Sequence, residues 1–167
     1  IHPDFPDWRH EIKVLKEAGV KGVKFHPEYQ DFFVDDEKLF SMYEALFEDN
    51  FIIIFHAGVD LGFQEPYHCT PARLRKILDT FPGGAIIAAH MGGYSYWNDV
   101  EKYLAGRNIY FDTSFSSNVL GAAGMENLIK AHGYDKILFG TDSPWADQSN
   151  EVSLIKSLNL KIEEISA

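Results

Sequence analysis

Three apolar runs, each ending in a residue able to bind a metal, constrain the fold of this chain more than any other feature. They are IIIFHAG at 52–58, AIIAAHMGG at 85–93 and ILFGTDSPW at 137–145. Short apolar runs rich in β-branched residues and without alternation are typical of strands buried on both faces of a parallel sheet. In such sheets, function gathers beyond the carboxyl ends of the strands. The sequence therefore predicts that His56, His90 and Asp142 meet at one edge of a sheet.

The composition predicts one globular domain over residues 1–167. Of the residues, 46% are hydrophobic and 14% aromatic, enough to fill a sizeable core. A formal charge of −10 disfavours nucleic acid and anionic membrane surfaces as partners. No apolar run reaches the roughly 20 residues that span a bilayer, and the first residues lack a secretory pattern. We expect a cytoplasmic protein, and the single cysteine agrees with a reducing compartment.

Hydrophobic periodicity and turn residues predict strands that alternate with helices along the chain. This order is typical of a parallel sheet with right-handed crossovers. Strands are expected at 21–26, 51–56, 85–90, 108–113 and 136–141, and helices at 8–18, 36–50, 70–81, 97–105, 125–132 and 151–158, with the start of another helix in IEEISA at 162–167.

Such a sheet can remain open and doubly wound or close into a (β/α)₈ TIM barrel. Each expected strand ends in a polar residue, and a ring of such residues is the active-site arrangement of a barrel, whereas an open sheet concentrates its site at one switch point. A complete barrel takes about 250 residues. We therefore expect an incomplete (β/α)₈ barrel that contains about strands 4–8. The strand ends are His26, His56, His90, Asp112 or Thr113, and Asp142.

Two histidines and one aspartate at neighbouring strand ends offer nitrogen and oxygen ligands to a divalent ion such as Zn²⁺. Three protein ligands and one open position are typical of a catalytic zinc site. A single histidine at a strand end is more often a hydrogen-bonded structural residue, but three ligand-type residues together favour the metal hypothesis. The candidate ligands are His56, His90 and Asp142.

Other residues near the strand ends have two interpretations each. Asp142 lies in a TDSP segment that could be only a turn, although strand periodicity directs its side chain to the barrel axis and favours a ligand. His26 could line a substrate pocket or form a structural hydrogen bond. Gly92 and Gly93 permit close backbone approach and could offer N–H groups to a substrate carboxylate. Trp145 could form a pocket wall or cover the rim.

The segments FHAG, AHMGG and FGTDSPW, in this order, resemble the amidohydrolase superfamily, and especially the amidohydrolase-related branch of TIM-barrel metal-dependent hydrolases. The resemblance covers essentially the whole chain. It implies that His56 and Asp142 bind a divalent metal, most simply Zn²⁺ with Mn²⁺ as the alternative, and that His90 and Asp142 take part in catalysis. The His-x-His pair that supplies two further metal ligands in that family does not occur in this sequence.

The function that this resemblance implies is hydrolysis of an amide, ester or lactone-like bond in a small molecule by a metal-activated water. Two alternatives stand beside it. One is nonoxidative decarboxylation of a small carboxylic acid. The other is a binding or assembly domain that has lost the site. Open sheet edges in an incomplete barrel favour pairing with another chain, so a homo-oligomer is also expected.

Overall fold

The computed structural model describes residues 1–161 and shows five parallel strands in one sheet, joined by helices. None of the helices in this range combines the length and the apolar character needed to cross a membrane. The strands are β1 (Gly22–Phe25), β2 (Ile52–Phe55), β3 (Ile86–Ala88), β4 (Tyr110–Asp112) and β5 (Ile137–Leu138). The helices are α1 (Trp8–Glu17), η1 (Glu37–Leu39), α2 (Phe40–Glu48), α3 (Pro71–Thr80), α4 (Trp97–Tyr103), α5 (Ser117–His132), η2 (Tyr134–Lys136) and α6 (Gln148–Ser157).

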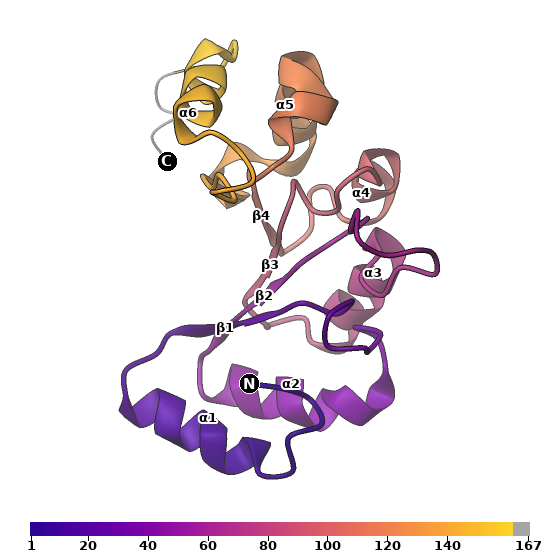
Figure 1. Ribbon diagram of the computed structural model, residues 1–167, viewed down its shortest axis with the longest axis vertical. Helices are drawn as coiled ribbons and strands as arrows, with labels where there is room; N and C mark the ends of the chain where they lie inside the picture. Colours follow the sequence, from indigo (N-terminus) through magenta and orange to yellow (C-terminus); the bar gives the residue numbers. More distant parts are fainter. Residues whose placement is uncertain (162–167) are drawn as a thin grey trace.

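The strands lie side by side in sequence order, from β1 to β5. Neighbouring helices also contact in order, α1 with α2, α3 with α4, α4 with α5 and α5 with α6. Figure 1 shows α1 and α2 at one end of the molecule and α5 and α6 at the other, with the strands between them. A doubly wound sheet would reverse its strand order at a switch point. The uninterrupted order confirms the prediction of a partial (β/α)₈ barrel.

One face of the sheet packs on the helices and contains the core. Phe25, Ile53 and Phe55 are fully buried on this face, and Phe25 stacks on Phe55 with ring centroids 5.9 Å apart. The opposite face, which is the lumen side of the barrel, is only partly covered. The expectation that the strands are buried on both faces was therefore wrong for the lumen face. Large side chains left partly exposed on the strands are Ile52 at 37%, Tyr110 at 37% and Leu138 at 39%.

The C-terminal third departs most from the predicted elements. Helix α5 begins at Ser117 rather than near residue 125, and its two helical pieces meet at Gly121, where φ is 68° and ψ is 170°. This glycine interrupts the helical periodicity, which explains why the sequence pattern shows only the second piece. Strand β5 is confined to Ile137–Leu138 within the expected 136–141. The helix expected at 162–167 lies outside the described residues.

Candidate active site

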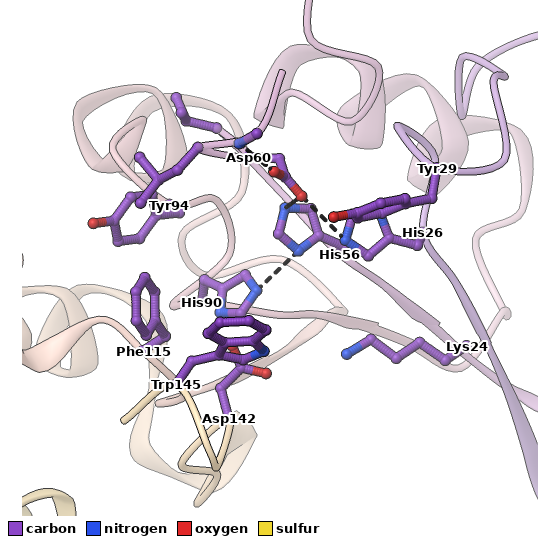
Figure 2. A pocket seen from close by; sticks show the side chains of 13 residues that line it. Lys24, His26, Tyr29, His56, Asp60, His90, Tyr94, Phe115, Asp142 and Trp145 are labelled. Carbon is purple, nitrogen blue, oxygen red and sulfur yellow. Dashed lines mark hydrogen bonds and ion pairs between the residues drawn. The ribbon is translucent and has the colours of Figure 1, made fainter. Parts of the chain in front are cut away.

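A cavity of about 520 Å³ opens at the carboxyl ends of the strands. Figure 2 shows that its side chains come from separate strands and from the loops that follow them. The lining residues are Lys24, His26, Tyr29, His56, Val59, Asp60, Leu61, Gly62, His90, Tyr94, Phe115, Asp142 and Trp145. The cavity therefore combines imidazoles, two carboxylates, one ammonium group and aromatic walls.

Two histidines and one aspartate form a group of possible metal ligands within residues 1–161. His26, His56 and Asp60 each offer a ligand atom, and these atoms lie within 4.8 Å of one another. Asp60 Oδ2 is 3.3 Å from His26 Nε2 and 3.8 Å from His56 Nε2. The two imidazoles stack with centroids 4.2 Å apart. Both rings thus direct a nitrogen toward the same carboxylate oxygen.

Backbone contacts between two loops bring Asp60 to the histidines. The backbone N–H of Val59 donates to the Tyr94 carbonyl (3.0 Å), and Tyr94 N–H donates to the Ala57 carbonyl (2.9 Å). Gly58 lies between them at φ 89°, where an added Cβ would stand 2.2 Å from Tyr94 N. Only glycine fits this approach. Asp60 Oδ1 accepts from Gly62 N–H at 2.8 Å, which leaves Oδ2 directed at the histidines.

His90 is held by a hydrogen-bond network at the end of β4. Asp112 Oδ1 accepts from the His90 backbone N–H (3.0 Å) and from the Ser114 backbone N–H and hydroxyl. Nδ1 of His90 lies 3.0 Å from both the carbonyl and the hydroxyl oxygen of Ser114. A carbonyl can only accept, so Nδ1 carries the proton. In neutral His90, Nε2 is then free to accept.

This assignment fixes the proton on His56 as well. His90 Nε2 lies 3.0 Å from His56 Nδ1, so the His56 N–H donates to His90. The lone pair of His56 is then at Nε2, on the side of Asp60. A network that begins at Asp112 thereby presents an unprotonated imidazole nitrogen to the carboxylate. Supporting hydrogen bonds of this kind orient metal-binding histidines.

The electrostatic environment keeps the two histidines of this group neutral. Burial, with smaller contributions from His90, His26 and Lys24, lowers the pKa of His56 to about 2. Burial also lowers the pKa of His26, against the opposing effect of Asp60. Neutral imidazole is the form that binds metals.

Two nitrogen atoms of this pair have no hydrogen-bonding partner although they are buried. They are His26 Nδ1 and His56 Nε2. Buried polar atoms are almost always hydrogen-bonded, so each exception requires an explanation. Nitrogen and oxygen donors from three residues at this spacing fit a divalent ion with an open coordination position. We therefore treat His26, His56 and Asp60 as a candidate metal site, because their donor atoms suit a divalent ion.

The structure brings together five of the residues singled out from the sequence. His26, His56, His90, Asp142 and Trp145 all line the cavity. Figure 2 shows Asp142 and Trp145 on the opposite side of His90 from Asp60.

Asp142 is in the cavity but not in the ligand group of His26, His56 and Asp60. Its side chain has no hydrogen-bonding partner within residues 1–161, and its backbone adopts a φ of 60°, which is rare for aspartate. Gly92 and Gly93, which were expected at the pocket, are not among the residues that line the cavity. A Cβ on Gly92 would meet the Phe111 ring and one on Gly93 would meet Pro71, because both glycines pack toward the helices.

The residues of the cavity that the sequence interpretation missed include Asp60, Lys24, Tyr29 and Phe115. Asp60 follows His56 by four residues, a spacing that gives no helical or strand signal inside a loop. Lys24 is two residues before His26 and on the same side of β1, so strand periodicity could have identified it. Tyr29 contacts His26 edge-on at 4.5 Å, and Phe115 lies 5.5 Å from Tyr94.

A family model described as "Amidohydrolase" matches residues 6–165 of the chain. A search of curated proteins finds no match. The family match spans nearly the whole chain and includes every residue that lines the cavity.

Solved structures share the fold at low sequence identity. A 5-carboxyvanillate decarboxylase from Novosphingobium aromaticivorans, complexed with manganese and 4-hydroxy-3-methoxy-5-nitrobenzoic acid, superposes with a TM-score of 0.73 at 18% identity, over 99% of this chain and 59% of that chain. A dihydroxybenzoic acid decarboxylase from Polaromonas, with manganese and 2-nitroresorcinol, gives 0.71 at 16%, over 99% and 62%.

A third match is a TIM-barrel protein from Bordetella bronchiseptica, with a TM-score of 0.73 at 18% identity, over 95% of this chain and 57% of that chain. The chain thus spans about three fifths of the length of the structures it matches.

Proposed function

The chain belongs to the amidohydrolase family, and from this premise we propose that it acts as a metal-dependent nonoxidative decarboxylase of a small aromatic carboxylic acid. One observation carries the proposal. His56 Nε2, a buried nitrogen without a hydrogen-bonding partner, faces Asp60 at a cavity whose walls are aromatic. A planar acid fits between such walls, because aromatic rings pack favourably edge to face or offset. The aromatic side chains of the wall are Tyr29, Tyr94, Phe115 and Trp145.

The resident ion in this proposal is divalent and is held by His26, His56 and Asp60. Manganese is favoured by the two decarboxylase structures that contain it, and zinc is the alternative because imidazole and carboxylate bind both ions. When bound, the ion orients the substrate and stabilises negative charge on its oxygens. The sequence-based alternative of His56 with Asp142 as ligands remains a proposal for the same ion.

The chain's own residues hold the substrate and move a proton. In the reaction, the bond between the ring carbon and the carboxylate breaks, carbon dioxide leaves, and the ring carbon takes up one proton. We assign proton transfer to His90 and Asp142, which line the cavity beside the metal-ligand group. His90 carries a proton on Nδ1 that Ser114 holds, its Nε2 accepts from the His56 N–H, and Asp142 has no side-chain hydrogen bond within the described range.

Hydrolysis of an amide, ester or lactone-like bond is the second candidate function. It is favoured by Asp142, a carboxylate of the cavity whose side chain has no hydrogen bond among the described residues. A general base in this position suits deprotonation of an attacking water. The two functions differ in their products, because only decarboxylation releases carbon dioxide.

The test incubates the protein, loaded with manganese or with zinc, with a panel of hydroxybenzoic acids and with matched esters and amides. We expect carbon dioxide and the decarboxylated arene from at least one acid, with loss of turnover in His90→Asn. His10→Asn is the matched control, because His10 is exposed on α1 far from the cavity. Ester or amide cleavage without carbon dioxide would favour the hydrolase. Absence of both metal binding and turnover would favour a non-catalytic binding domain.

A further inference from the structure

We propose that Lys24 is the anion-recognition residue of the cavity, and that the ligands taken there are planar aromatic molecules whose carboxylate pairs with the Lys24 ammonium. The inference rests on the proposed function and deepens it by naming the charge that the substrate must carry.

The position of Lys24 in the sheet directs it into the cavity. Val23 and Phe25, its neighbours on β1, are buried toward the helices, so Lys24 faces the lumen. It lies two residues before His26, about 6–7 Å along the strand. A lysine stem can cover that distance and present its ammonium group at the level of the histidines. Figure 2 shows the Lys24 nitrogen pointing toward the side of the cavity with His90 and Trp145.

Lys24 is exposed on the lumen side of the sheet, and its charge has no partner among the described residues. The strand register aligns it with Ile54 on β2, which in turn aligns with Ile87 on β3. Within residues 1–161, Lys24 forms no ion pair and no hydrogen bond, and it is the one lysine or arginine among the described residues that line the cavity. An ammonium group without an internal partner is available to pair with an anionic ligand, and such charge-assisted hydrogen bonds are stronger than neutral ones.

The formal charges of the cavity match a monoanion once a metal is bound. Asp60 and Asp142 contribute two negative charges and Lys24 one positive charge, which leaves −1. A divalent ion changes this to +1, so one carboxylate neutralises the loaded cavity. Without Lys24 the loaded cavity would be neutral, and the acid would lose its counter-charge.

The experiment measures binding rather than turnover, by calorimetric titration of the manganese-loaded protein with salicylate and with the neutral salicylamide. We expect Lys24→Met to weaken salicylate binding about 10- to 100-fold, the range for losing a charge-assisted hydrogen bond, and to change salicylamide binding less than about twofold. Lys24→Arg should recover most of the affinity. Lys21→Met is the matched control, because Lys21 is exposed and lies just before the start of β1.

Manganese affinity is the second readout. It shows whether Lys24→Met has lost only the contact with the acid or has also damaged the metal site. It should stay equal or become tighter in Lys24→Met, because a positive charge near His26 and His56 is removed. If Lys24→Met folds poorly by circular dichroism, Lys24→Gln replaces it.

The inference is overturned if salicylate and salicylamide lose affinity equally, if neither loses affinity, or if the unsubstituted loaded protein does not bind salicylate at millimolar concentration. A Lys24-dependent affinity for the acid without carbon dioxide release from any acid would uphold the inference and contradict the decarboxylase proposal. Decarboxylation with an unchanged KM in Lys24→Met would uphold the decarboxylase proposal and overturn the inference about Lys24.

Discussion

His56 and His132 are both largely buried, and burial lowers the pKa of each, yet their surroundings differ in one respect. Both ring nitrogens of His132 have partners, since Nδ1 accepts from Gly106 N–H (3.2 Å) and Nε2 donates to the Ile109 carbonyl (2.8 Å). Its ring stacks on Phe111 at 3.8 Å. His56 has one partnered nitrogen and one buried nitrogen without a partner.

This comparison shows that a buried neutral histidine is not in itself a sign of function. The orphaned lone pair is the distinguishing feature, because a polar atom is rarely buried without a partner in a folded protein. His132 therefore stabilises the fold, joining α5 to the loop before β4, whereas the His56 nitrogen lacks its partner until a ligand is present. Substitutions at the two positions should accordingly affect different properties.

The largest effect is expected for His56→Ala. Because one of three proposed ligands is lost, manganese affinity should fall more than about 100-fold, beyond the range for residues that only support a ligand. Turnover should fall with it, and the melting temperature without metal should change little. Mass spectrometry measures the metal content, and a melting curve of the metal-free protein measures the change in stability. Retention of one tightly bound metal per chain would place the ion elsewhere.

The next effect is expected for His90→Asn, which should lower turnover about 10²- to 10⁴-fold, the range for losing a general acid or base. Metal content should remain nearly intact, because His90 is not one of the three proposed ligands. If metal and activity fall together, His90 is a ligand. An unchanged rate and an unchanged pH profile would make it a structural histidine like His132.

A smaller effect is expected for Ser114→Ala, which removes the hydroxyl partner of His90 Nδ1 but keeps the carbonyl partner. Metal affinity or turnover should fall about 10- to 100-fold, the range for supporting hydrogen bonds at a metal site. Ser116→Ala is the matched control, because the Ser116 hydroxyl donates to the Ser114 carbonyl without touching the histidines. Equal effects of the two variants would mean that only local loop stability has changed.

The smallest effect on the active site is expected for His132→Leu, which should leave metal binding and turnover unchanged. The free energy of unfolding should fall by about 2–4 kcal/mol, because Gly106 N–H and the Ile109 carbonyl lose their partner. Urea unfolding measures this loss. Any loss of metal affinity in this variant would contradict the separation of the two histidines.

The pH dependence of stability provides a further check on His132. Its folded pKa is lowered, so at pH values above about 6.5 the residue is neutral in both states. As the pH falls from there toward the folded pKa, the unfolded chain binds a proton that the folded protein excludes, and stability decreases. His132→Leu should therefore lose less stability than the unsubstituted protein over this interval. Parallel stability curves would show that His132 titrates normally in the fold.

The sequence predicted the parallel sheet and the meeting of His56 with His90, because both follow from apolar runs that end in histidine. Strand periodicity needs no knowledge of distant residues, and the carboxyl ends of parallel strands necessarily share one edge. Asp142 and Trp145 also lie on the cavity, but in the loop after β5, where strand periodicity does not place them.

Asp60 and the glycines after His90 could not be placed in this way. The position of Asp60 depends on the close backbone contact of Gly58 with Tyr94, which joins loops 36 residues apart. Gly92 was expected at the pocket because glycine often permits ligand approach, but here it makes room for the Phe111 ring. Both outcomes depend on tertiary packing, which a local sequence pattern does not encode.

The most direct test of the metal site is anomalous diffraction at the manganese absorption edge from crystals of the loaded protein. We predict one peak within bonding distance of His26, His56 and Asp60, about 2.0–2.2 Å from the ligand atoms. A peak bound by His56 and Asp142 but not by His26 or Asp60 would contradict this account, as would a fully loaded crystal with no peak among these residues.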